Sequence, residues 1–308
     1  MKKANMMMIR KKRRGKKKGV LWGMAVLLGI LLALFIGGRV NAPSISQNPD
    51  VDLEHLYSPN AVLTEANSGR VIAVHNGDKR IYPASLTKIM TAILAVEHTE
   101  DLEQTVTLPE DIFPPLYEQG ASMAGFQPGE EVRLKDLLYG ILLPSGAECC
   151  LAFADRIAGS EGQFAVMMNE KARELGMKNT HFTNSTGLHD PDHYSTVKDI
   201  SILLQYALKN DTFRTVFTTS RYSTQPSNLH PEGFTFYSTL SRSLDNPRVS
   251  GGEILGGKTG YTSEAGLCLA SLARIHGKEY ILVTAGADGT HETEPFHILD
   301  AVSVYNQI

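Results

Sequence analysis

Hydrophobic positions recur with two different periods along the chain. Residues 61–76 form two short apolar runs on either side of Asn67-Ser68-Gly69, a pattern typical of two strands joined by a turn. From about residue 85 to 210 the apolar positions recur at helical spacing. After about residue 245, three strand-like runs follow: GEILGGKTG, GLCLASLARI and KEYILVTAGA. The last apolar pattern predicts an amphipathic helix over about 293–306.

Capping residues mark the ends of helices in the middle of the chain. Ser160 and Gln163 form a capping box at the start of one predicted helix, and Gly176 ends that helix. Thr196 is placed to cap the next helix, in STVKDISILLQYALKN. Residues 132–143, VRLKDLLYGILL, have the same helical spacing. The middle of the chain is therefore predicted to be helical.

The order of these elements predicts an α+β fold. Two strands, a helical block, three strands and one helix can form a five-stranded antiparallel sheet in which the first and last strands meet. The sheet lobe would contain residues 55–84 and 245–308, and the helical lobe, inserted at about 85–244, would flank it. A cleft between two such lobes is the expected place for a site.

The N-terminal region has the pattern of a membrane anchor. Residues 1–18 carry ten Lys and Arg and no acidic residue, and residues 19–37 are 19 residues without a charge. A helix of that length spans about 28 Å, close to the thickness of the hydrocarbon core. Positive charge before the helix predicts a cytoplasmic tail and a folded domain, 55–308, on the extracytoplasmic side of the cell membrane, joined to the helix by a linker at 38–54.

A cleaved signal peptide is the alternative for this region. The tolerable cleavage site is Val40-Asn41-Ala42, and Pro43 follows it, which should hinder processing. The basic tail is followed by a membrane segment and an acidic body, so we expect no nucleic-acid partner. Three cysteines, Cys149, Cys150 and Cys268, are too few for a disulfide framework and are predicted to be buried thiols.

One lysine lies in an otherwise apolar run. Between Tyr82 and Val96 the only formal charge is Lys88, and Ser85 precedes it by three residues on the same helix face. Pro83 fits the entry of that helix. A desolvated lysine has a lowered pKa and can accept the proton of a serine hydroxyl, which makes the serine a nucleophile. The alternative is a capping serine beside a lysine that extends to solvent.

Two further short segments place polar groups among apolar neighbours. In LLPSGAE, residues 142–148, Ser145 interrupts a strongly apolar stretch, although it could simply cap a turn between helices. In GGKTG, residues 256–260, Lys258 and Thr259 lie between glycines that permit close approach of a ligand backbone, although the segment could simply be a glycine-rich strand end.

Together, S-x-x-K, the Ser145 segment and K-T-G resemble the motif set of penicillin-binding proteins and serine β-lactamases. The segments YPASLTKIMTA, HFTNSTGLHDPDHYSTVKD and GGKTGYTSEAGLCLAS are most similar to those of the low-molecular-mass D-alanyl-D-alanine carboxypeptidases. The resemblance covers most of 55–305. It implies the serine β-lactamase/DD-peptidase-like fold, a peptidoglycan stem peptide ending in D-Ala-D-Ala as substrate, an acyl-enzyme, and β-lactams as covalent inhibitors.

The resemblance also assigns roles to single residues. It makes Ser85 the nucleophile, Lys88 its general base, and Ser145 a relay of the proton to the leaving amine. The other positions are expected to bind substrate. Lys258 and Thr259 would bind the terminal carboxylate, and Gly260 belongs to the same motif. The backbone N–H groups of Ser85 and Tyr261 would form the oxyanion hole.

This chain departs from the family pattern at Ala147, where the family usually has asparagine. Alanine cannot hydrogen-bond the substrate amide or Lys88, so the Gly146 backbone or a water would have to substitute. Relatives also often carry a C-terminal β-domain with an amphipathic anchor, but only 48 residues follow Gly260, so the N-terminal helix is expected to do the tethering.

Three alternatives to this function are possible. A β-lactamase of the same fold would need a glutamate that activates water, and no E-x-x-L-N pattern lies between the second and third motifs. A catalytically inactive wall-binding or penicillin-sensing protein would fit the missing asparagine. His189 and His193 have no convincing third ligand, so we expect neither a metal nor a cofactor.

Overall fold

A computed structural model of the chain describes residues 51–308. The predicted basic tail at 1–18, the predicted anchor at 19–37 and nearly all of the predicted linker at 38–54 lie outside the described residues. Among residues 51–308, none of the helices combines the length and the apolarity needed to cross a bilayer.

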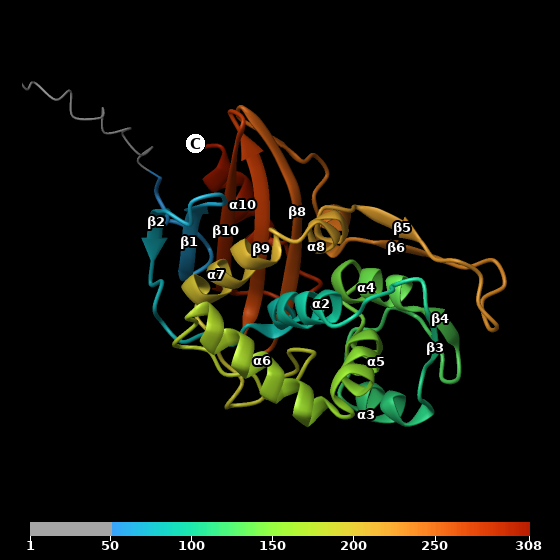
Figure 1. The fold of residues 1–308 in the computed structure, drawn as a ribbon. Helices are drawn as coiled ribbons and strands as arrows, with labels where there is room; N and C mark the ends of the chain where they lie inside the picture. The colour runs from blue at the N-terminus through green and yellow to red at the C-terminus, as the bar shows by residue number, and fades with distance from the viewer. Residues whose placement is uncertain (1–50) are drawn as a thin grey trace, which may run out of the picture. The chain divides into compact units, whose positions relative to one another are not determined.

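An antiparallel sheet of six strands forms the framework (Figure 1). In spatial order the strands are β2 (Val71–His75), β1 (Asn60–Glu65), β10 (Lys278–Ala287), β9 (Gly266–Ile275), β8 (Gly252–Thr262) and β7 (Arg248–Val249). The prediction of a five-stranded sheet is therefore wrong. The additional strand, β7, has only two residues, which is too short to produce an alternating pattern in the sequence.

Strands from the two ends of the described chain meet inside this sheet, as predicted. β1 pairs with β10 in a regular antiparallel register from Asn60 opposite Ala285 to Glu65 opposite Tyr280. β1 also pairs with β2 on its other side. The N-terminal hairpin is thus joined to the C-terminal strands, and the helices between them are inserted in sequence. The residue ranges given above for the two lobes stay a prediction.

The helices lie at one end and on both faces of the sheet (Figure 1). They are η1 (Ala84–Thr87), α2 (Lys88–Glu97), η2 (Glu110–Ile112), α3 (Phe113–Glu118), α4 (Leu134–Leu142), α5 (Ala147–Ala158), α6 (Glu161–Leu175), α7 (Val197–Ala207), α8 (Asp211–Phe217), α9 (Thr239–Ser243) and α10 (Phe296–Tyr305). Helices α2 to α6 gather at the end of the sheet drawn lowest in Figure 1. α7 packs against β1 and β10, and α10 packs against β9 and β10.

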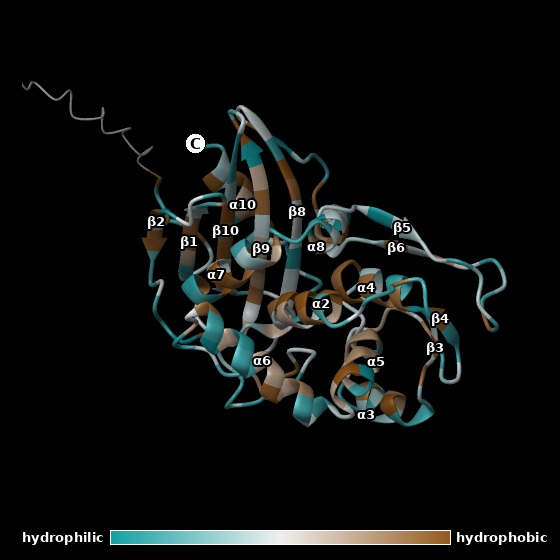
Figure 2. Ribbon diagram, in the orientation of Figure 1, coloured by the Kyte–Doolittle hydropathy of each residue, from teal (hydrophilic) through white to brown (hydrophobic). Residues whose placement is uncertain are grey.

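The two faces of the sheet belong to two separate hydrophobic clusters. Successive side chains of a strand point to opposite faces. Accordingly, Val62 of β1 packs in the cluster that contains the buried helices, while its neighbours Ala61 and Leu63 pack with Ile298 and Val304 of α10. Figure 2 shows β10 and α2 as largely hydrophobic, which fits their position between other elements.

The capping predictions are confirmed. The Ser160 side chain accepts a hydrogen bond from the N–H of Gln163 at the start of α6, and Gly176 ends that helix in a left-handed conformation, with φ of 77°. The Thr196 side chain accepts from the N–H of Asp199 at the start of α7. The three cysteines are free and buried, also as predicted.

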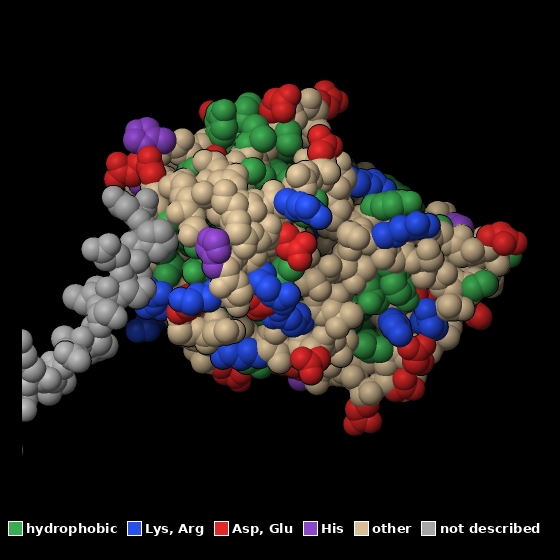
Figure 3. Space-filling model, turned by 90° about the horizontal axis from the view of Figure 1, so that it is seen from above, with side chains coloured by type: hydrophobic (Ala, Val, Ile, Leu, Met, Phe, Trp, Pro, Cys, Tyr) green, Lys and Arg blue, Asp and Glu red, His purple; other side chains and the backbone are tan. Residues whose placement is uncertain are grey.

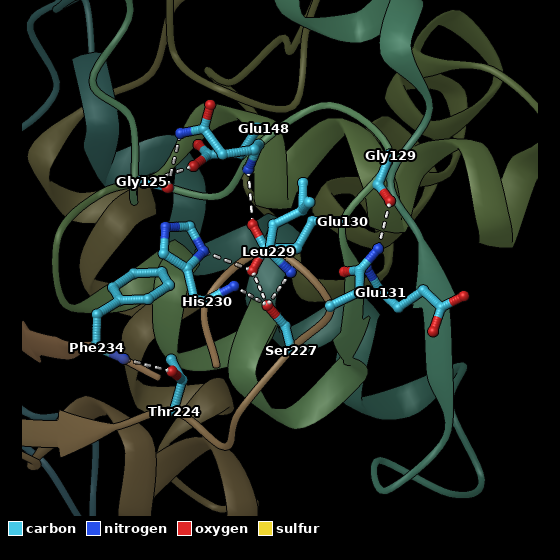
Figure 4. A network of polar contacts seen from close by, with 12 residues as sticks. Gly125, Gly129, Glu130, Glu131, Glu148, Thr224, Ser227, Leu229, His230 and Phe234 are labelled. Atoms are coloured by element: carbon cyan, nitrogen blue, oxygen red, sulfur yellow. Dashed lines mark hydrogen bonds and ion pairs between the residues drawn. The ribbon is translucent and has the colours of Figure 1, made fainter. Parts of the chain in front are cut away.

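Two small hairpins, missed in the sequence, extend from the helical region. They are β3 (Thr105–Thr107) with β4 (Glu131–Arg133), and β5 (Arg221–Ser223) with β6 (Thr235–Tyr237). Buried Glu130 links them (Figure 4): its carboxylate accepts from the Ser227 hydroxyl at 2.6 Å and the Gln127 N–H at 2.8 Å, and pairs with His230 at 2.8 Å. This network fixes the long β5–β6 loop against β4.

Charged side chains of both signs are interspersed over the face drawn in Figure 3. A mixed surface of this kind favours solubility and gives no single-sign field on that face.

Candidate active site

Ser85 and Lys88 meet at the junction of a short 3-10 helix and an α-helix. Pro83 caps η1, which contains Ser85, and Lys88 is the first residue of α2. The sequence placed Ser85 in the first turn of an α-helix, whereas the structure places it in a 3-10 turn. Side chains three residues apart eclipse each other in a 3-10 turn. The Nζ of Lys88 therefore lies 3.1 Å from the Oγ of Ser85 and donates to it.

Lys88 is buried, and it does not extend to solvent. Its exposed fraction is 2%, and its Nζ also donates to the carbonyl oxygen of Thr186 at 2.6 Å. Burial lowers the pKa of Lys88 because it disfavours the charged ammonium, although nearby Cys150 and Glu148 act in the opposite direction. The structure therefore does not support the interpretation in which Lys88 extends to solvent. Its amine is directed at the Ser85 hydroxyl.

Two glycines allow the backbone to close tightly around the serine. Ala84 has a φ of 46°, a left-handed conformation that is uncommon for residues other than glycine. A Cβ on Gly187 would lie 1.9 Å from the carbonyl oxygen of Ala84, and a Cβ on Gly260 would lie 3.0 Å from the backbone N of Ser85. Glycine is therefore required at position 187, and at position 260 a side chain would crowd the backbone of Ser85.

Ser145 and Lys258 form the second pair. Ser145 lies just before α5 with a φ of 71°, and Lys258 lies in the middle of β8. The Nζ of Lys258 donates to the Oγ of Ser145 at 3.0 Å and to the carbonyl oxygen of Thr259 at 2.8 Å. Lys258 is fully buried, and burial followed by repulsion from Lys88 lowers its pKa well below the usual value.

Two adjoining clefts open beside these pairs. The smaller one, of about 340 Å³, contains Lys88 and continues along β8 to Glu264, and the larger one, of about 670 Å³, contains Ser145 and Thr259. Four residues line both clefts: Ser85, Ser122, Tyr261 and His291. Strand β8 borders both clefts, so a substrate lying along β8 would pass directly over Ser85.

The structure thus brings together every predicted site residue: Ser85, Lys88, Ser145, Lys258, Thr259, Gly260 and Tyr261. The hydroxyl of Thr259 is hydrogen-bonded to that of Thr239 on α9, at 2.7 Å. The ring of Tyr261 stacks edge-on against His291, with centroids 4.8 Å apart.

The comparisons with known proteins agree with this geometry. The family model described as D-alanyl-D-alanine carboxypeptidase matches residues 45–289. This chain belongs to the D-alanyl-D-alanine carboxypeptidase family.

The aligned region makes up different shares of this chain and of its relatives. The D-alanyl-D-alanine carboxypeptidase DacF of Bacillus subtilis is 36% identical over 275 residues, which are 87% of this chain and 66% of that protein. The D-alanyl-D-alanine carboxypeptidase of Streptomyces sp. strain K15 is 30% identical over 83% of this chain and 88% of its own length. The chain spans only 37% of the length of DacC of Escherichia coli.

Among solved structures, the Streptomyces K15 DD-transpeptidase shares the fold. It superposes with a TM-score of 0.73 and 28% identity, covering 82% of this chain and 97% of that one. The likeness extends over the sheet and the helices, so the α+β DD-peptidase fold predicted from the sequence is confirmed, with the correction to the strand count.

Some residues of this family site carried no signal in the sequence. Thr186 binds Lys88 through its carbonyl oxygen. It lies in a segment that resembles the family as a whole, and nothing in that segment predicts a role for this residue. Ser122 and His291 line both clefts but belong to no motif. A main-chain carbonyl and an isolated serine or histidine leave no pattern, because only the folded chain brings them to the site.

The two loop histidines have different surroundings. The Nδ1 of His193 accepts from the N–H of Thr183 at 3.1 Å, and its Nε2 lies 2.8 Å from the hydroxyl of Thr87 in η1. His193 therefore supports the turn that carries Ser85. His189 lines the smaller cleft and lies 3.8 Å from the carboxylate of Glu264. Within residues 51–308, no group of three or more His, Cys, Asp or Glu side chains is placed to hold a metal ion.

His193 gives a testable pH dependence of stability. Burial lowers its pKa to about 4, whereas the pKa in the unfolded chain is about 6.5. The unfolded state then binds more protons between these values, so the stabilisation by neutral His193 is complete above about pH 6.5 and is lost as the pH falls to about 4. Its size is on the order of 3 kcal/mol. Chemical denaturation at several pH values measures it.

His193→Gln is the comparison for this prediction. The variant should be less stable than the wild type at pH 7.5, and the difference should shrink as the pH falls toward 4.5. His297, whose pKa burial also lowers to about 4, would leave a residual pH dependence in both proteins. A difference between the two proteins that is constant with pH would contradict a role for His193 titration.

Proposed function

We propose that the protein is a serine D,D-carboxypeptidase that removes the terminal D-alanine from peptidoglycan stem peptides. The observation that carries this proposal is the contact of 3.1 Å between the Oγ of Ser85 and the Nζ of a lysine that is only 2% exposed. A buried amine of lowered pKa beside a hydroxyl is the arrangement that activates a serine nucleophile. The family membership of the chain and the names of its relatives supply the substrate.

In the acylation step, Ser85 attacks the carbonyl carbon of the penultimate D-alanine while Lys88 accepts the hydroxyl proton. The hydrogen bond from Lys88 to the carbonyl of Thr186 keeps the amine beside Ser85. We place the oxyanion between the backbone N–H groups of Ser85 and Tyr261. One such donor contributes about 10²- to 10³-fold to the rate.

Departure of D-alanine requires a proton on its amine, which the Ser145 hydroxyl would give while it recovers a proton from Lys88, so that Lys88 is neutral again for the next step. Lys258 donates to the oxygen of Ser145, so the hydroxyl hydrogen of Ser145 is free to point toward the leaving nitrogen. Lys258 is fully buried beside Ser145 and would act on the terminal carboxylate from there, while the exposed side of Thr259 would contact the carboxylate in the larger cleft. Water then attacks the ester, with Lys88 as base, and releases the shortened peptide.

Two measurements on a fragment of residues 43–308 test the proposal. The fragment should release D-alanine from an N-acetylated peptide ending in D-Ala-D-Ala, and intact-protein mass spectrometry should find one covalently bound penicillin. Absence of both on folded protein would refute the mechanism. A penicillin adduct without release of D-alanine would support the penicillin-sensing alternative, and rapid hydrolysis of the penicillin would support a β-lactamase.

We also propose that residues 19–37 anchor the protein in the cytoplasmic membrane with the catalytic domain outside. The proposal rests on the uncharged 19-residue segment and the ten basic residues before it. Protease added to intact protoplasts should remove the catalytic domain from membranes and spare the basic tail. Recovery of full-length protein free in the medium would refute an anchor.

A further inference from the structure

The second motif lacks the side chain that the family pattern provides. Ala147 stands where the resemblance places an asparagine, whose amide would have two partners, the lysine of the first motif and an amide of the substrate. The structure shows how Lys88 is oriented without the asparagine. The Nζ of Lys88 donates to the carbonyl of Thr186 at 2.6 Å, so this lysine is oriented without help from position 147. The contact with the substrate still has to be replaced.

The N–H groups of Gly146 and Ala147 cannot supply that contact. The N–H of Gly146 donates to the carbonyl of Gly140 at 2.8 Å, and the N–H of Ala147 donates to the carbonyl of Ser122 at 2.8 Å. Both donors are therefore used within the protein. This excludes the Gly146 N–H as the substitute that the sequence suggested, and the second bond brings another residue next to Ala147.

That residue, Ser122, has a free hydroxyl at the reaction centre. Ser122 lines both clefts, as Ser85 does, and its side chain is exposed. Among residues 51–308, no hydrogen-bond partner is found for its Oγ. The hydroxyl is thus available to donate to a ligand in the cleft, from a position directly beside Ala147.

The segment that carries Ser122 is held firmly against the second motif. Glu148, the residue after Ala147, is fully buried and accepts from the N–H of Ala124 at 2.7 Å and of Gly125 at 3.0 Å. Figure 4 shows the Glu148 carboxylate directed at Gly125. With the bond from Ala147 to Ser122, three hydrogen bonds tie this segment to the start of α5. Ser122 is therefore positioned by the same helix end that would have carried the asparagine.

We propose that the Ser122 hydroxyl takes the place of the missing asparagine and donates a hydrogen bond to the substrate. Its acceptor would be the carbonyl oxygen of the amide that joins the third stem residue to the penultimate D-alanine. This amide lies on the acyl side of the scissile bond, in the smaller cleft beside Ala147 and Tyr261. The inference rests on the proposed D,D-carboxypeptidase function and adds a substrate-contacting residue to it.

The first test compares three variants on an N-acetylated tripeptide ending in D-Ala-D-Ala. Loss of one substrate hydrogen bond should lower kcat/KM of Ser122→Ala about tenfold. Ser303→Ala removes the same atom from an exposed serine on α10 that lines neither cleft, and it should stay within about twofold of the wild type. Adding Ala147→Asn to Ser122→Ala should restore most of the activity, because the amide returns to the family position. Melting temperatures check that all variants are folded.

A second test separates a substrate contact from a structural role. In a peptide with a trans-alkene in place of that acyl-side amide, the proposed acceptor is absent. The wild type and Ser122→Ala should then cleave the alkene peptide at equal rates. A tenfold difference that persists on the alkene peptide, or equal activity of Ser122→Ala and Ser303→Ala on the normal peptide, would overturn the inference while leaving the proposed function intact. A wild-type protein that releases no D-alanine would overturn both.

Discussion

Ser85→Ala is expected to abolish release of D-alanine and covalent binding of penicillin. The substitution removes the oxygen that forms the ester in the proposed mechanism. Loss of a nucleophilic serine lowers kcat by up to about 10⁶-fold in a serine protease. We expect a loss of at least about 10³-fold here, measured as D-alanine released and as the mass of the protein after incubation with penicillin.

The result for Ser85→Ala can be interpreted only if the variant folds. Removing one oxygen from a partly exposed side chain leaves Ala84, Gly187 and Gly260 in place, so the melting temperature should change little. Ser303→Ala, at an exposed serine of α10 outside both clefts, serves as the matched control and should bind penicillin as the wild type does. A penicillin adduct on folded Ser85→Ala protein would show that another residue is the nucleophile.

Substitution of Lys88 should have the second largest effect. Lys88→Arg keeps a positive charge but cannot accept a proton, because the guanidinium stays protonated in proteins. Lys88→Met keeps most of the volume and removes the amine. A general base contributes about 10²- to 10⁴-fold, so both variants should lose that much in the rate of acylation by penicillin. Activity retained in Lys88→Arg would show that the charge, rather than proton transfer, is what matters.

The pH dependence of the acylation rate should follow the titration of Lys88. Burial lowers the pKa of Lys88, so the neutral amine is more abundant at a given pH than it would be for an exposed lysine. The acylation rate should rise with pH while Lys88 loses its proton and become constant above its pKa, with a midpoint below 10.5, the ordinary value. This rising limb should be absent in Lys88→Met. A limb of unchanged midpoint in that variant would assign the titration to another group.

The sequence predicted most of the site because its chemistry depends on short spacings. Ser85 and Lys88 lie three residues apart, and a single turn of helix is enough to bring them together, whether it is α or 3-10. The apolar run around Lys88 also predicted the burial that lowers its pKa. Lys258 and Thr259 were recognisable because glycines surround them on a strand. Each of these signals is contained within about ten residues of sequence.

The parts that were missed depend on contacts between distant segments. Thr186 binds Lys88 through a carbonyl, which every residue has, and Ser122 reaches the site only because Glu148 and Ala147 hold its segment. β7 and the two small hairpins are too short to give a period. The departure at Ala147 was visible in the sequence, but what compensates for it could be seen only once the chain was folded.

The place of β1 in the sheet has a consequence for the timing of folding during synthesis. β1 ends at Glu65, yet its partner β10 begins only at Lys278. Contacts of such long sequence separation slow folding, and an unpaired strand edge can aggregate. A nascent chain holding Ser85 and Lys88 still lacks Lys258, Tyr261 and the strand that closes the sheet. The site can therefore form only after β10 has been released from the ribosome, and a chain that stops before β10 would leave the edge of β1 unpaired and open to aggregation.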